Sequence, residues 1–105
     1  MNHILLENEK YIGPGTTKEE YTFYDLGGFP GAVAGGNNAI VGEIYEISGF
    51  TLMRLDSLEG HPQFYRRNTI NLQGGDEVYM YILDGGFIKN QEPIIESGDW
   101  HKGRR

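Results

Sequence analysis

Residues 48–60 read SGFTLMRLDSLEG, and this stretch predicts the one helix of the chain, over residues 48–59. Ser48 is a residue type that caps helix N-termini, and Gly60 is the type that ends helices. Between them, leucines recur at helical spacing and predict one apolar stripe that faces the core. The stripe consists of Leu52, Leu55 and Leu58.

The segments on both sides of this helix are short, rich in apolar and aromatic residues, and separated by glycine and proline. The chain holds 16 glycines and 4 prolines, which cut it into pieces of strand length. Gly13-Pro14-Gly15 is expected to stop the first strand, and residues 73–76 to join the last two in a hairpin. The predicted strands are 9–12, 21–26, 32–34, 39–47, 64–72 and 77–83.

The pattern predicts an α+β fold: a small, mainly antiparallel β-barrel with one packed helix. Residues 77–83 are apolar on both faces, which is typical of a strand that is covered on both sides. A length of 105 residues is typical of one domain, so we expect a single domain over residues 1–105.

The composition excludes several kinds of partner and chemistry. A net charge of -6 argues against nucleic acid and anionic membranes as partners, because binding these requires clustered Lys and Arg. The chain has no cysteine, which excludes disulfides and thiolate chemistry. The histidines at positions 3, 61 and 101 lack metal-ligand spacing, so we expect no metal and no cofactor. No apolar run approaches the roughly 20 residues of a membrane helix, and we expect a cytoplasmic location.

Four stretches of the chain resemble one known family. Residues 55–67, LDSLEGHPQFYRR, resemble the most diagnostic segment of the γ-glutamylcyclotransferase-like (AIG2-like) family, a Leu-Asp-x-Leu-Glu-Gly motif followed by a Tyr-x-Arg-type strand. The other three stretches, which resemble the family in the same order, are YDLGGFP at 24–30, VGEIYE at 41–46 and SGDW at 97–100. The resemblance covers nearly the whole chain and implies the fold of that family.

The resemblance also implies an activity and a catalytic residue. Family members cleave γ-glutamyl amides when the substrate's own α-amine attacks its γ-carbonyl, which yields 5-oxoproline and a free amine. One carboxylate can take the proton from the α-ammonium and return it to the leaving amine if its pKa is raised toward neutrality. Glu59 matches the family's catalytic glutamate, and its position at the negative end of the helix dipole favours a raised pKa. From position alone, Glu59 reads as a solvated helix-end glutamate.

Five further residues are candidates for contacts with a substrate that carries a γ-glutamyl group. Tyr65 and Tyr81 combine an apolar ring with a polar tip, and could hydrogen-bond the substrate or fill the core. Arg66 could contact a carboxylate through two hydrogen bonds, or could be a surface charge on a strand. Gly28 and Pro30 could shape the wall of the pocket, or could form a plain tight turn.

The start of the chain departs from the family pattern. Members open with a strand carrying a Tyr-Gly-Thr-Leu-type or Tyr-Gly-Ser-Leu-type motif, whose loop holds the glutamyl α-carboxylate. Residues 1–6, MNHILL, resemble the stretch that follows this motif. Two functions therefore stay open: a γ-glutamylcyclotransferase with Glu59 as acid and base, or a non-catalytic module that binds or sequesters a small molecule. A barrel without that strand has an open edge, which predicts a homodimer by strand addition, or cover by residues 1–6.

Overall fold

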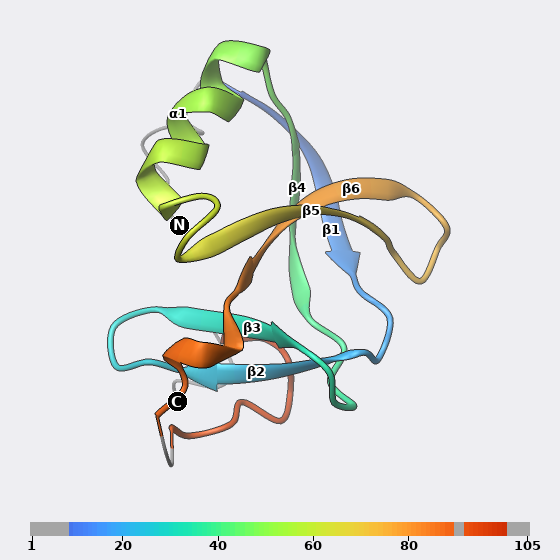
Figure 1. The fold of residues 1–105 in the computed structure, drawn as a ribbon. Coiled ribbons are helices and arrows are strands. Elements are labelled where there is room, and N and C mark those ends of the chain that lie inside the picture. Colours follow the sequence, from blue (N-terminus) through green and yellow to red (C-terminus); the bar gives the residue numbers. More distant parts are fainter. Residues whose placement is uncertain (1–8, 90–91, 101–105) are drawn as a thin grey trace.

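Six strands and one α-helix are formed by residues 9–89 and 92–100, the part of the chain that the computed structural model describes (Figure 1). The helix α1 spans Gly49–Glu59, and a 3-10 turn, η2, spans Gly85–Phe87. No helix within these residues is long and apolar enough to cross a membrane. The strands are β1 (Lys10–Thr16), β2 (Tyr21–Asp25), β3 (Pro30–Ala34), β4 (Val41–Glu46), β5 (Tyr65–Asn71) and β6 (Glu77–Leu83).

The named strands pair antiparallel, two by two. The β2–β3 and β5–β6 pairs are hairpins of consecutive strands. In contrast, β1 pairs with β4, and the β2–β3 hairpin lies between these two strands in the sequence. Together with α1, these pairs confirm the α+β, mainly antiparallel fold class. The ladders form three separate two-stranded sheets, so a closed barrel stays a prediction.

The strand β1 is longer than the sequence predicts. It continues through Pro14, which lies opposite Glu43 of β4, and its register shifts between Tyr11 and Gly13. A proline is tolerated in a strand that makes a ladder on one side only, because its missing N–H group can face away from the partner. The prediction that the Gly-Pro-Gly sequence stops this strand was therefore wrong.

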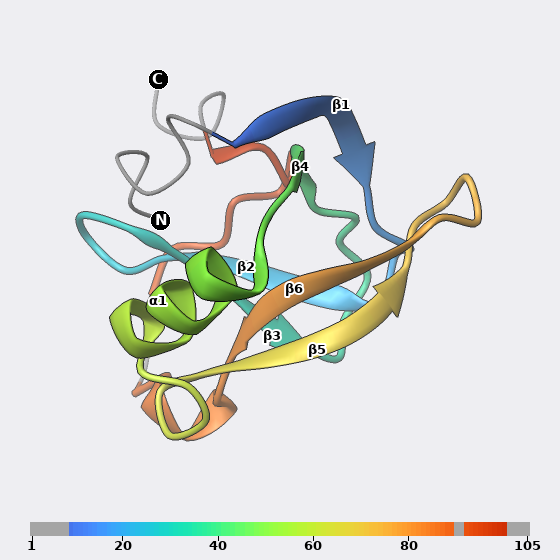
Figure 2. The same cartoon turned by 90° about the horizontal axis from the view of Figure 1, so that it is seen from above.

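The core lies between the β2–β3 and β5–β6 hairpins, which cross each other in Figure 2. The strand β3 approaches β6 so closely that a Cβ atom at Gly31 would lie 2.8 Å from Cδ2 of Leu83. Only the last two residues of β6, Ile82 and Leu83, are buried, whereas Tyr79 is 60% exposed. The prediction of a strand covered on both faces holds only for this end of β6. The buried residues that form one contiguous cluster in this core are Tyr21, Phe23, Ala32, Ile40, Ile82 and Ile95.

The helix α1 begins and ends where the sequence predicts. The Ser48 side chain accepts a hydrogen bond from the Thr51 N–H group, and Gly60 adopts the left-handed conformation with a φ of 69°. The predicted apolar stripe is wrong at one position, because Leu58 is 50% exposed. The inward face instead runs from buried Leu55 to Glu59, four residues later on the same side of the helix.

Gly98 should not tolerate a side chain. Its φ is 71°, and a Cβ atom there would lie 1.8 Å from the Ala39 carbonyl oxygen. We expect Gly98→Ala to lower the free energy of unfolding by about 2 kcal/mol or more, since the left-handed conformation alone costs an L-residue about 1–2 kcal/mol. Gly74→Ala is the matched control, because a Cβ atom at Gly74 meets nothing within 4 Å. Urea unfolding compares the two variants, and equal stability would contradict the prediction.

Candidate active site

A cavity of about 640 Å³ opens where the end of α1 meets the β2–β3 turn, the strands β5 and β6, and the β1–β4 pair. Five of the six residues that the sequence predicts for the site line this cavity, although they come from distant parts of the chain. They are Gly28, Pro30, Glu59, Tyr65 and Tyr81. The fold thus brings the candidate catalytic carboxylate and both candidate phenols to one place.

Arg66 is the predicted site residue that does not line the cavity. Along β5, Tyr65 is buried, Arg66 is exposed and Arg67 is partly buried. Successive side chains of a strand point to opposite faces, so Arg66 points away from the face that carries Tyr65. A role for Arg66 in substrate binding stays a prediction that this geometry does not support.

Glu59 is the last residue of α1 and lies on the helix face that is turned toward the protein. It follows Asp56 by three residues and Leu55 by four, so the three side chains share one side of the helix. Burial raises the pKa of the Glu59 carboxyl above its ordinary value. The predicted direction of this shift agrees with the structure, and burial is its main cause.

Tyr65 is buried, and its hydroxyl donates a 2.6 Å hydrogen bond to the carbonyl oxygen of Pro30. This bond ties the start of β5 to the start of β3. Burial, with a smaller contribution from the charge of Glu59, raises the pKa of Tyr65 to about 12. The phenol therefore stays protonated near neutral pH, and it lines the same cavity as Glu59.

Tyr81 is held by a carboxylate that the sequence analysis did not single out. Its hydroxyl donates a 2.6 Å hydrogen bond to Oδ1 of Asp56. The same oxygen lies 3.2 Å from Nε of Arg67, and the guanidinium of Arg67 lies 4.8 Å from the Tyr79 ring centre. Burial, followed by the hydrogen bond to Asp56, raises the pKa of Tyr81. One carboxylate therefore connects the helix to both strands of the β5–β6 hairpin.

Backbone contacts around His61 complete this connection. The backbone N–H group of His61 donates to the Asp56 carbonyl oxygen at 2.9 Å, and the backbone N–H group of Arg67 donates to Nδ1 of His61 at 3.0 Å.

The sequence analysis did not single out Asp56 or Arg67, although their spacing from the predicted site residues indicates both. Asp56 precedes Glu59 by three positions on a helix, and Arg67 follows Tyr65 by two positions on a strand, so each shares a face with a predicted site residue.

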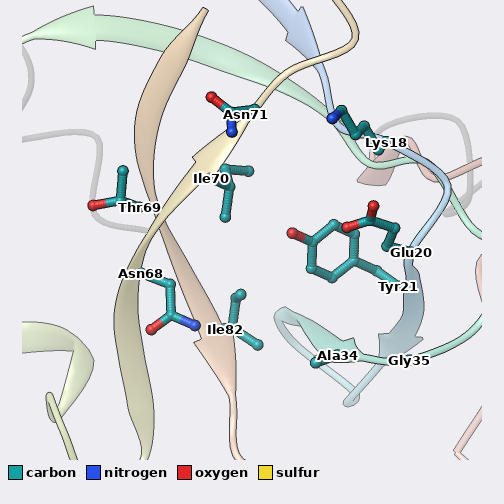
Figure 3. A pocket seen from close by; sticks show the side chains of 10 residues that line it. All are labelled: Lys18, Glu20, Tyr21, Ala34, Gly35, Asn68, Thr69, Ile70, Asn71 and Ile82. Carbon is teal, nitrogen blue, oxygen red and sulfur yellow. The ribbon is translucent and has the colours of Figure 1, made fainter. Parts of the chain in front are cut away.

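A second cavity, of about 550 Å³, lies between β5 and the start of β2 (Figure 3). None of the predicted site residues lines it. Figure 3 shows the Tyr21 ring on one side and Ile70 and Ile82 on the other, with polar side chains around them. Lys18, Glu20 and the lining residues 68, 69 and 71 are exposed to solvent. Because solvent screens exposed charges, we place the candidate site in the first cavity.

The first cavity is suited to proton transfer. A partly buried carboxylate with a raised pKa can accept a proton from a bound group and return it. Among the residues that the structure describes, no group of three or more histidine, aspartate and glutamate side chains is arranged to hold a metal ion. His3 and His101 lie outside the described residues, as does the segment 1–6 that was predicted to cover an open edge.

The fold and the cavity together define a small α+β protein with a partly buried carboxylate on the wall of a cavity, and comparison with known proteins gives its family. The profile described as "Gamma-glutamyl cyclotransferase, AIG2-like" matches residues 1–102. A Vibrio cholerae protein named "Putative gamma-glutamylcyclotransferase" is 39% identical over 99 residues, which cover 94% of this chain and 83% of that protein. The chain belongs to the AIG2-like γ-glutamylcyclotransferase family.

Solved structures agree with this assignment. The solution structure of YtfP from Escherichia coli has a TM-score of 0.72 at 32% identity, over 99% of this chain and 88% of that one. An AIG2-like protein from Mus musculus has a TM-score of 0.72 at 26% identity, over 91% of this chain and 77% of that one. These similarities confirm the predicted family and its fold.

The raised pKa of Glu59 predicts a specific pH dependence of stability. A carboxyl whose pKa is higher in the folded state binds more protons there, so its contribution to stability is complete below its unfolded pKa of about 4.3. This contribution is lost as pH rises through the folded value. Urea unfolding between pH 4 and pH 7.5 should therefore show wild type losing stability relative to Glu59→Gln as pH rises. A constant or increasing advantage of wild type would contradict the prediction.

Proposed function

We propose that this chain converts γ-glutamyl amides to 5-oxoproline and a free amine, with Glu59 as both general base and general acid. The observation that carries the proposal is a partly buried carboxyl with a raised pKa, at the family's glutamate position, on the wall of a 640 Å³ cavity. A raised pKa suits a group that must take up and release a proton near neutral pH. The family to which the chain belongs supports this choice of reaction.

In the proposed reaction, Glu59 first takes a proton from the substrate's α-ammonium. The amine that results attacks the γ-carbonyl carbon, and a C–N bond closes the five-membered ring. The tetrahedral oxyanion then collapses, the bond to the leaving nitrogen breaks, and Glu59 returns its proton to that nitrogen. After ring closure, the ring nitrogen still carries one proton more than it has in 5-oxoproline. Glu59 also passes this proton to the leaving nitrogen, so the amine leaves as an ammonium ion. The reaction as written needs no metal and no cofactor.

The non-catalytic alternative rests on the same cavity. A pocket with two phenols and a carboxylate could bind a small molecule without converting it, and the fold does not decide between these functions. The two functions differ in one observable, the release of 5-oxoproline.

The decisive experiment measures 5-oxoproline release from a panel of γ-glutamyl amines, amino acids and dipeptides. We expect Glu59→Gln to lower kcat/KM by about 10³-fold, within the usual range for removing a general acid or base. Glu77→Gln is the matched control, because Glu77 is exposed on β6 and does not line the cavity. Full activity of Glu59→Gln would contradict the assigned role. No release by wild type, combined with binding of the same ligands, would favour the binding module.

We also propose a homodimer through open strand edges. In the described part of the chain, β6 makes a ladder only with β5, and β4 makes a ladder only with β1 apart from a bridge between Val41 and Asp99. Consecutive residues of each strand, 41–45 of β4 and 78–81 of β6, line the same cavity. Consecutive residues alternate faces, so the cavity lies along the edges of both strands. Such edges can pair with a strand of a second chain.

Sedimentation velocity at increasing protein concentration tests the dimer. We expect a concentration-dependent shift from monomer to dimer, and the shift should weaken in a Tyr79→Lys variant. A lysine on an edge strand discourages strand addition, and Tyr79 is exposed on β6. A wild-type protein that stays monomeric at the highest concentration would contradict the proposal.

A further inference from the structure

We propose that the second cavity, between β5 and the start of β2, binds a free α-amino acid with an aliphatic side chain. Its volume of about 550 Å³ lies in the range of roughly 300–1,000 Å³ that is usual for small-molecule sites. Among the described residues, the two cavities share only Ile70. The site is therefore distinct from the candidate active site, and the proposal goes beyond the proposed reaction.

The observation that carries the proposal is the unused hydroxyl of a buried tyrosine. Tyr21 is only 6% exposed, and Figure 3 shows its hydroxyl directed into the cavity, toward the strand that carries Ile70. Within residues 9–89 and 92–100 this hydroxyl forms no hydrogen bond, in contrast to the hydroxyls of Tyr65 and Tyr81. A buried tyrosine hydroxyl usually has a partner, because an unsatisfied polar group costs free energy. A polar group from outside the chain would supply that partner.

The polar side chains around this hydroxyl are also unpaired. In the described part of the chain, neither Lys18 nor Glu20 forms an ion pair, and the side-chain amides of Asn68 and Asn71 form no hydrogen bond. Lys18 and Glu20 lie two positions apart along the chain and line the same cavity, yet their charges do not pair with each other. One unpaired cation and one unpaired anion match a ligand that carries both charges.

Figure 3 shows where each charge of such a ligand would bind. Lys18 and Asn71 lie at one end of the cavity, on opposite sides of it, and both can donate hydrogen bonds to a carboxylate. The carboxylate of Glu20 lies beside the ring of Tyr21. Burial, followed by the charge of Glu20, raises the pKa of Tyr21, which agrees with this proximity. The Glu20 carboxylate and the neutral phenol oxygen can both accept hydrogen bonds from an ammonium group.

The remaining wall of the cavity is apolar. Ile82 is 8% exposed and lies at the end away from Lys18, with Ile70 between them (Figure 3). An aliphatic side chain placed there would be removed from water, which is favourable. An inorganic anion would face the charge of Glu20, and a polyamine would face the charge of Lys18. A zwitterion with an aliphatic side chain uses both charges and the apolar wall.

Three probes that differ by one charged group test the proposal. L-leucine carries both charges, 4-methylpentanoate lacks the α-amine, and 3-methylbutylamine lacks the carboxylate. Isothermal titration of the wild-type protein at pH 7 should show L-leucine binding about tenfold more tightly than either analogue, as expected when one charged hydrogen bond is lost. Equal affinity for L-leucine and either analogue would overturn the proposal.

Two variants assign the charges of the ligand to their partners. Glu20→Gln should lower the affinity for L-leucine about tenfold without weakening the binding of 4-methylpentanoate, because only an ammonium loses its partner. Lys18→Met should lower the affinity for L-leucine by a similar factor without weakening the binding of 3-methylbutylamine. Glu19→Gln is the matched control, because Glu19 is an exposed neighbour of both residues and does not line the cavity. Unchanged affinity for L-leucine in both variants would overturn the proposal.

Tyr21→Phe separates a binding role of the hydroxyl from a structural role. A hydroxyl that meets only a ligand can be removed without loss of stability, so the urea midpoint of the ligand-free variant should equal or exceed that of wild type. The affinity for L-leucine should fall severalfold. A lower midpoint with unchanged affinity would show that the hydroxyl is structural, and would overturn its place in the site.

Glu59→Gln distinguishes the two cavities. This variant should bind L-leucine as tightly as wild type, because Glu59 lines only the first cavity. Loss of L-leucine binding in Glu59→Gln, with binding kept in Glu20→Gln, would place the amino acid in the first cavity and overturn the proposal. None of these titrations measures 5-oxoproline release, so failure of the amino-acid site and failure of the proposed reaction are separate outcomes.

Discussion

The carboxylate of Asp56 is the contact on which the geometry of the candidate site depends. It accepts the Tyr81 hydroxyl, pairs with Arg67, and lies one helical turn before Glu59. Helix and hairpin are thus joined at a point next to the catalytic candidate. A partly buried charge is stable there because its partners satisfy it, and removal of one partner would leave the others uncompensated. The position of Glu59 relative to Tyr81 therefore depends on the contacts of Asp56.

Local signals predicted the elements of the fold well. The helix followed from its Ser48 cap, its Gly60 stop and its leucine spacing, and the β5–β6 hairpin followed from two apolar runs around a glycine turn. The errors arose where tertiary contacts decide. Whether Pro14 ends β1 depends on which edge of that strand pairs with a neighbour. Whether Leu58 or Glu59 faces inward depends on how the whole helix packs against the strands.

The sequence predicted most residues of the candidate site but not the hydrogen bonds that hold them. Resemblance to a family motif identified Glu59, and the same motif holds Asp56, yet nothing local shows that Asp56 would bind Tyr81, 25 residues away. Likewise, the bond from Tyr65 to the carbonyl of Pro30 joins positions 35 residues apart. Spacing alone can say that a phenol is present, whereas only the folded chain decides whether it donates or accepts.

The hydrogen bond from the Arg67 backbone N–H group to His61 determines the tautomer of the imidazole as well as the position of the ring. Because Nδ1 accepts the Arg67 N–H group, it cannot carry a hydrogen itself. The neutral imidazole therefore carries its hydrogen on Nε2. A residue that the family motif places only as a neighbour of Glu59 thus has a defined tautomeric state, set by the strand that also carries Tyr65.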